Sequence, residues 1–326
     1  MRRRRTLGAM LALLGAPLAG VAQPSRGTLR IAILDAASED TQRHHWRAFL
    51  KRLAELGYTE GRNLTVEQRF AKGATERLPA LAAEVVALTP GIIVANGTPA
   101  ARAAKQASAT IPIVFLGVAD PVRDGIAASL ARPGGNLTGL SIISSELGLK
   151  WIELLREIAP GAKRFAFLGD TSNIAGTRNF DQLREQLRAL GVTIQIFDAH
   201  RRDELGRSFD AIARERYEGF YLGNSATILA NRDRILQFAA QQKLPAVYPR
   251  REYVDAGGLL FYGADLSVSY LRAAEYVLRI AQGAKPAELP IERPDVVRMV
   301  VNLKAARAQG IGIPKSILVR ADEVIE

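Results

Sequence analysis

The sequence predicts an α/β protein with two doubly wound, Rossmann-like parallel-sheet lobes and a ligand cleft between them. Three observations support this fold class. Apolar runs alternate with amphipathic helices, the pattern occurs twice, and 326 residues are enough for two domains. Alternating strands and helices predict parallel sheets that are covered by helices on both faces. Each copy is too long for a solenoid repeat.

The first copy begins with an apolar strand over 29–35. A helix that carries Phe49 and Leu53 on its apolar face follows, and it ends at Gly57, where a left-handed C-cap fits. The remaining elements of this copy are a strand over 63–70, a helix over 75–88, and strands over 91–96, 111–115 and 134–138.

The second copy repeats this order from a strand over 164–170. Its first helix carries Phe180, Leu183 and Leu187 and ends at Gly191. The remaining elements are strands over 192–197, 219–224, 244–248 and 257–261, with a helix over 203–217 before the second of these strands.

We assign residues 28–141 and 266–326 to the first lobe and residues 142–265 to the second. A helix over 268–282, capped by Asp265 or Ser267, is expected to return to the first lobe. A strand over 296–302, a helix to 309 and an extended end complete the chain. The crossings near 138–144 and 261–265 are the expected hinges, with Gly139 and Gly263 as their most adaptable residues.

Residues 1–22 have the pattern of a secretory signal peptide. Arginines at 2–5 precede an apolar run over 7–19 and the small residues Gly20 and Ala22. The run is shorter than the ~20 residues that a membrane span needs. A basic tail on a cytosolic protein is the alternative, but it does not explain the apolar run. We expect export and cleavage near Ala22, and the arginine pair leaves twin-arginine export open.

Composition and motifs exclude several kinds of chemistry. The chain has no cysteine, so disulfides, iron–sulfur clusters and a cysteine nucleophile are excluded. The sequence lacks a dinucleotide or P-loop glycine motif, a G-x-S-x-G elbow and an H-E-x-x-H motif. The net charge of +11 includes the four N-terminal arginines, and the other basic runs are isolated, so nucleic acid is not an expected partner. We expect a binding protein without cofactor or metal.

Candidate binding residues follow from the rule that ligands bind beyond the carboxyl ends of parallel strands. In the first lobe these are Asp35, Asn96, Gly97, Thr98 and Asp120. In the second lobe and at its crossing they are Thr171, Ser172, Asn173, Asn224, Ser225, Tyr248, Tyr262 and Asp265.

Two of these candidates suit a zwitterion. Thr98 as a cap before Pro99 would begin a helix whose free N–H groups attract a carboxylate. Asp120 could hold an ammonium group. The alternatives are that Thr98 only caps its helix and that Asp120 only forms a turn before Pro121. Tyr248 and Tyr262 could stack on a planar group or belong to the core.

Several longer motifs carry a family resemblance. They are LGYTEGRNL at 56–64, ANGTPAA at 95–101, GVADPV at 117–122, ARPGGNLTGLS at 131–141, YGAD at 262–265, VNLK at 301–304 and ADEVI at 321–325. Together they resemble the ABC-transporter substrate-binding proteins that include tryptophan- and tyrosine-binding members. This resemblance implies the type I periplasmic binding-protein fold, a periplasmic location, delivery of a small solute to an inner-membrane ABC permease, and no catalysis.

Three functions remain open at this point. An exported solute receptor, monomeric and closing on its ligand by a hinge, is favoured. A sensory protein for a membrane receptor is the second, and a two-lobed transferase is the third, although export argues against activated-sugar substrates. The hydroxyls, amides and carboxylates at the strand ends suit a small polar solute. We favour an amino acid, aromatic ones included, over nucleosides.

Overall fold

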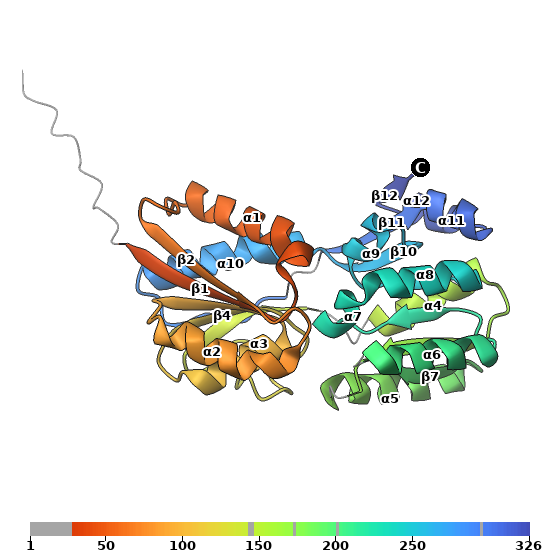
Figure 1. Ribbon diagram of the computed structural model, residues 1–326, viewed down its shortest axis with the longest axis horizontal. Coiled ribbons are helices and arrows are strands. Elements are labelled where there is room, and N and C mark those ends of the chain that lie inside the picture. Colours follow the sequence, from red (N-terminus) through yellow and green to blue (C-terminus); the bar gives the residue numbers. More distant parts are fainter. Residues whose placement is uncertain (1–27, 143–146, 172–173, 200–201, 294–295) are drawn as a thin grey trace, which may run out of the picture.

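The computed structural model describes residues 28–142, 147–171, 174–199, 202–293 and 296–326. The expected signal peptide and two candidate site residues, Ser172 and Asn173, lie outside these ranges. Within the described residues, every helix is too short or too polar to cross a membrane. Two α/β lobes lie side by side, so the predicted fold class is confirmed (Figure 1).

The first lobe is a five-stranded parallel sheet in the order β2-β1-β3-β4-β5. Its strands are β1 (Leu29–Asp35), β2 (Leu64–Phe70), β3 (Ile92–Asn96), β4 (Ile113–Val118) and β5 (Leu137–Ser141). Strand β1 is apolar throughout because both of its faces are covered. Ile31 packs under helices α1 (Glu39–Glu55) and α10 (Leu266–Ala281), whereas Leu34 packs under α2 (Leu78–Ala87) and α3 (Thr98–Ala107).

The second lobe is a seven-stranded sheet in the order β12-β11-β10-β9-β8-β6-β7. Its strands are β6 (Arg164–Gly169), β7 (Thr193–Asp198), β8 (Phe220–Leu222), β9 (Ala246–Tyr248), β10 (Leu260–Ala264), β11 (Val297–Asn302) and β12 (Glu323–Ile325). Helices α4 (Leu147–Ile158) and α5 (Ile174–Ala189) cover one face, and α6 (Arg202–Arg214) and α8 (Arg232–Gln242) cover the other.

Shorter helices connect or flank these elements. They are η1 (Thr75–Arg77), α7 (Ala226–Ala230), α9 (Arg251–Asp255), η2 (Pro286–Glu288), α11 (Leu303–Gln309) and α12 (Lys315–Arg320).

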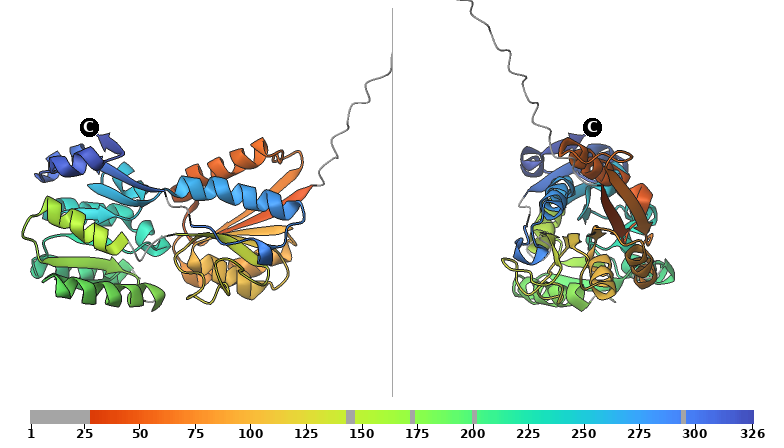
Figure 2. Two further views of the ribbon diagram at one scale, coloured as in Figure 1. Left: turned by 180° about the vertical axis from the view of Figure 1, so that it is seen from behind. Right: turned by 90° about the vertical axis from the view of Figure 1, so that its left-hand side faces the viewer.

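The C-terminal segment differs from the prediction. Helix α10 packs on α1 in the first lobe, but β11 then pairs antiparallel with β10 and β12 pairs with β11. Residues 297–326 therefore belong to the second lobe, and the expected extended end contains helix α12 (Figure 2). This placement has a physical reason. Without β11, the backbone N–H and C=O groups along one edge of β10 would lack hydrogen-bond partners, and the apolar strand β11 supplies them. The chain consequently crosses between the lobes three times.

The two glycines expected at the hinges are held inside strands. Gly139 lies in β5, where an added Cβ would be 2.1 Å from the Phe115 carbonyl oxygen on β4. Gly263 lies in β10, where an added Cβ would be 2.6 Å from the Pro249 oxygen. Close approach of neighbouring backbone explains both glycines without a hinge role.

The Gly139→Ala substitution should therefore destabilise the first lobe. Its methyl group would force β4 and β5 apart, an overpacking that costs ~1–3 kcal/mol or more. Thermal unfolding measures the loss. Gly312→Ala is the matched control, because an added Cβ there has no described atom within 4 Å. Equal melting temperatures for the two variants would contradict the close approach at Gly139.

Candidate functional site

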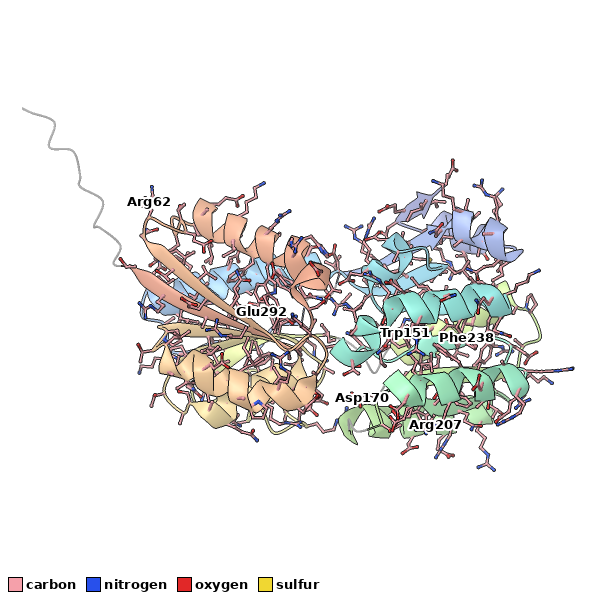
Figure 3. All side chains as sticks on the ribbon, viewed as in Figure 1. Arg62, Trp151, Asp170, Arg207, Phe238 and Glu292 are labelled. Atoms are coloured by element: carbon pink, nitrogen blue, oxygen red, sulfur yellow. The ribbon has the colours of Figure 1, made fainter. Side chains whose placement is uncertain are left out.

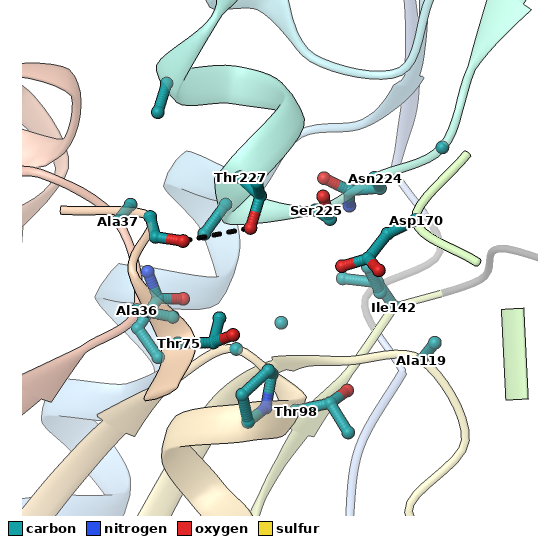
Figure 4. A pocket seen from close by; sticks show the side chains of 18 of the residues that line it. Ala36, Ala37, Thr75, Thr98, Ala119, Ile142, Asp170, Asn224, Ser225 and Thr227 are labelled. Carbon is teal, nitrogen blue, oxygen red and sulfur yellow. Dashed lines mark hydrogen bonds between the residues drawn. The ribbon is translucent and has the colours of Figure 1, made fainter. Parts of the chain in front are cut away.

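A cleft of about 1270 Å³ lies between the lobes, with walls from both (Figure 4). Asp35, Asn96 and Gly117, at or near the carboxyl ends of β1, β3 and β4, line it on the first lobe. Asp170 and Asn224, which follow β6 and β8, line it on the second. The strand-end rule therefore locates the cleft correctly.

The structure divides the predicted residues into two groups. Those that line the cleft are Asp35, Asn96, Gly97, Thr98, Asn224 and Ser225. Those that lie outside its lining are Asp120, Thr171, Tyr248, Tyr262 and Asp265.

Asp35 and Asn96 form a rigid floor. The buried Asp35 carboxylate accepts hydrogen bonds from Trp46 Nε1 at 2.8 Å, from Asn96 Nδ2 at 3.0 Å and from the Ala37 N–H at 2.8 Å. Burial raises the pKa of Asp35, although these hydrogen bonds oppose the shift. Because its acceptors are already used, Asp35 supports the site from beneath.

Gly97, rather than Thr98, is the N-cap of α3. Its φ of 92° favours glycine, and Pro99 follows within the first helical turn. Thr98 is the first residue of the helix and not its cap, so the predicted capping role is wrong. Thr98 instead lines the cleft at the start of α3 (Figure 4).

Asp120 belongs to a turn, which was the alternative to binding an ammonium group. Its carboxylate accepts a hydrogen bond from the Arg123 N–H at 3.0 Å and lies 3.3 Å from Arg123 Nε. Asp170 does line the cleft, at the edge of the second lobe that faces the first (Figures 3 and 4).

The remaining candidates outside the cleft have structural roles. The buried Tyr248 ring stacks on Tyr253 at 5.1 Å, in the core of the second lobe. The Thr171 hydroxyl donates to Asp198 at 2.6 Å. The Tyr262 carbonyl accepts from Trp151, and Asp265 caps α10 by accepting from the Ser267 N–H at 3.0 Å.

The loop after β2 is a part of the site that the sequence did not reveal. Lys72, Gly73 and Thr75 line the cleft from the first lobe. Thr227 of the second lobe donates a hydrogen bond to the Gly73 carbonyl at 2.9 Å, which joins the lobes across the cleft. The strand-end rule would have found this loop if it had been applied to β2.

An apolar extension of the cleft enters the second lobe between its sheet and helices α4 and α5. We call it the aromatic recess, and it is lined by Trp151, Phe167, Phe180, Leu183, Ile196 and Tyr221. The Phe167 ring stacks on Tyr221 at 4.7 Å and on Phe180 at 5.2 Å. Phe167 and Ile196 stay partly exposed although they lie within strands, which marks the hollow above them.

A buried polar cluster joins the lobes beside the cleft. We call it the junction network: Gln42, His45, Arg250, Glu252 and Tyr270. Arg250 of the second lobe donates to Glu252 and, at 3.3 Å, to Gln42 on α1. Tyr270 on α10 also donates to Gln42, at 2.9 Å, and His45 Nε2 lies 3.6 Å from Glu252.

The charges of the junction network balance within the protein. Burial opposes ionisation of Glu252, but the Arg250 charge and the hydrogen bonds from His45 and Arg250 hold its pKa well below the usual range. His44, His45 and Glu252 present possible metal-ligand atoms within 4.8 Å of one another. A cation there would compete with the guanidinium that already binds Glu252, so the donor set does not favour a metal.

A family comparison agrees with this architecture. The model of the family described as "ABC transporter substrate binding protein" matches residues 30–325. The chain belongs to this family. Its members are binding proteins rather than enzymes and are typically extracytoplasmic, and the fold is that of type I periplasmic binding proteins, as the resemblance implied.

Three relatives place this substrate-binding protein more closely. A tyrosine-binding protein of Clostridioides difficile (strain R20291) is 24% identical over 281 residues, covering 85% of this chain and 80% of the relative. A conserved domain protein from Vibrio cholerae has a TM-score of 0.85 at 28% identity, covering 91% and 99% of the two chains. A domain from Streptococcus pneumoniae in complex with L-Trp has a TM-score of 0.84 at 22% identity, covering 92% and 100%.

Replacing Glu252 should strongly destabilise this binding protein. Glu252→Gln leaves the Arg250 guanidinium buried without a counter-charge, and such losses cost ~3–5 kcal/mol. Urea unfolding gives the free energy. Glu153→Gln, which breaks an exposed pair with Lys150, is the control and should cost under ~1 kcal/mol. Similar small losses in both variants would contradict a stabilising role for the junction network.

The same variant isolates a pH effect. The lowered pKa of Glu252 means that its stabilisation is complete above the unfolded carboxyl pKa of ~4.3 and is lost as the pH falls below it. The raised pKa of Asp35 acts with the opposite sign in both proteins. Between pH ~5 and ~3, the free energy of unfolding should fall more steeply in the wild type than in Glu252→Gln. Parallel pH curves would exclude this linkage.

Proposed function

We propose that the protein binds an aromatic amino acid in the interlobe cleft and delivers it to an inner-membrane permease of an ABC importer. The observation that carries this proposal is the aromatic recess, which opens into a cleft whose other walls are polar. An aromatic side chain needs an apolar pocket with ring partners, whereas the amino and carboxylate groups need charged or polar partners. The tyrosine-binding and L-Trp-bound relatives support the same ligand class.

The polar walls offer a place for each end of a zwitterion. Helix α3 begins at Thr98, and free N–H groups in its first turn favour a carboxylate. Asp170 lies across the cleft on the second lobe and suits an ammonium group (Figure 4). The Asn224 side chain lies next to Asp170 and adds an amide.

This ligand position involves both lobes. The α3 terminus belongs to the first lobe, whereas Asp170 and the aromatic recess belong to the second, so a bound amino acid favours closure about the three crossings. We propose that the mature protein is a periplasmic monomer, released by cleavage near Ala22, because the basic and apolar residues before that point match a secretory signal.

A thermal-shift screen tests the ligand class. L-Trp, L-Tyr and L-Phe should raise the melting temperature of the mature chain, whereas hexoses and nucleosides should not. At 100 times its dissociation constant, a ligand stabilises the folded state by ~2.7 kcal/mol. Stabilisation by a sugar or a nucleoside, with none of the three amino acids active, would overturn the proposal.

Asp170→Asn should weaken binding of the amino acid. The substitution removes the countercharge for the ammonium group, and losing one partner of a buried charge pair costs ~2–5 kcal/mol, which is at least tenfold in affinity. Calorimetry with the most stabilising amino acid measures the change. Asp120→Asn is the matched control, because Asp120 does not line the cleft and its carboxylate pairs with the neighbouring Arg123; the affinity of this variant should equal that of the wild type. Equal affinities for all three proteins would remove Asp170 from the site.

A further inference from the structure

Tyr221 places an unpaired polar group in the aromatic recess. Its side chain is 2% exposed, and its hydroxyl has no hydrogen-bond partner among the described residues. The other polar ring group in the recess is satisfied, because Trp151 Nε1 donates to the Tyr262 carbonyl at 2.7 Å. The Tyr221 hydroxyl therefore stands out within an otherwise apolar pocket.

The position of this hydroxyl is fixed by its neighbours. Tyr221 lies in the centre of β8, and its ring stacks on Phe167 at 4.7 Å and packs at a tilt against Trp151 at 5.6 Å. A buried hydroxyl without a hydrogen-bond partner destabilises the folded protein, and contact with an apolar ring does not offset this cost. Tyr221 lines the cleft, but its hydroxyl has almost no exposed surface, so a ligand ring that enters the recess and displaces the neighbouring side chains can supply the missing partner.

We propose that the Tyr221 hydroxyl recognises a polar atom on the ring of the ligand, so that the site selects tryptophan or tyrosine over phenylalanine. This inference rests on the proposed function, because it assumes that the ring of an amino acid enters the recess. The shape and apolar surface of the recess do not distinguish these aromatic side chains, so the inference assigns the distinction to Tyr221.

The chemistry of the three rings explains the selection. A phenol hydroxyl donates and accepts, so Tyr221 can accept from an indole N–H or exchange a hydrogen bond with a ligand phenol. A phenyl ring offers neither group and leaves Tyr221 unpaired in the complex. A site built to pair a polar substrate group discriminates strongly against the analogue that lacks it, whereas apolar contact alone discriminates weakly.

The test is calorimetry of the mature chain with L-Trp, L-Tyr and L-Phe, before and after Tyr221→Phe. The wild type should bind L-Trp or L-Tyr at least tenfold more tightly than L-Phe. In Tyr221→Phe this ratio should fall at least tenfold, because the polar ligand loses its partner while L-Phe loses none. Tyr217→Phe is the control, since the Tyr217 hydroxyl bonds to Gln195 at 2.7 Å and lies outside the cleft lining. It should leave the ratio unchanged.

Other outcomes separate this inference from the proposed function. If the wild type binds none of the three amino acids, the proposed function and the inference both fail. If it binds them and Tyr221→Phe leaves their ratio unchanged, the function stands and the role of Tyr221 is wrong. The melting temperature without ligand gives a second readout. It should not fall in Tyr221→Phe, and a marked fall would show that the hydroxyl has a partner within the protein and would overturn the inference.

Discussion

The direction of the parallel strands is the constraint on which the rest of this structure depends. Parallel strands must be joined by crossovers, so the carboxyl ends of β1 to β5 lie at one edge of the first sheet, and those of β6 to β9 at one edge of the second. The two edges face each other across the cleft. The residues that follow each strand therefore meet in one place, together with the N-termini of helices such as α3.

The polar groups around the cleft fall into two kinds. Asp35 is fully hydrogen-bonded, and Arg250 is neutralised by Glu252, so both are satisfied by the protein itself. Such groups rigidify the floor and the junction of the lobes and offer little net charge to a ligand. Thr98, Asp170 and Tyr221 lie along the cleft walls, and in the proposed site they are the groups that contact the ligand. A site arranged in this way suits a neutral or zwitterionic solute better than an ion.

Periodicity and strand direction predicted most of the fold and about half of the site. Both signals are local. The lobe to which β11 belongs depends instead on its pairing with the free edge of β10, although β11 follows a helix of the first lobe in the sequence. Asp120 and Asp170 both follow strands. Asp120 accepts from the Arg123 N–H in a turn, which the sequence offered as an alternative through Pro121 but could not choose over ligand binding. Trp151 and Tyr221 lie inside a helix and a strand, where a rule about strand ends does not reach.

The division of the proposed site between the lobes has a consequence for selectivity. A ligand shifts the balance between open and closed forms only by the difference in its affinity for them. In the proposed site, a free aromatic ring would fill the recess and contact the second lobe alone, and a small amino acid would reach the α3 terminus without filling the recess. Only a molecule that has both an aromatic ring and the polar groups of an amino acid would contact both lobes, and it would therefore bind the closed form more tightly than the open form. If the protein closes as proposed, closure adds to the discrimination made by the aromatic recess, because the closed form is stabilised only by a ligand that contacts both lobes.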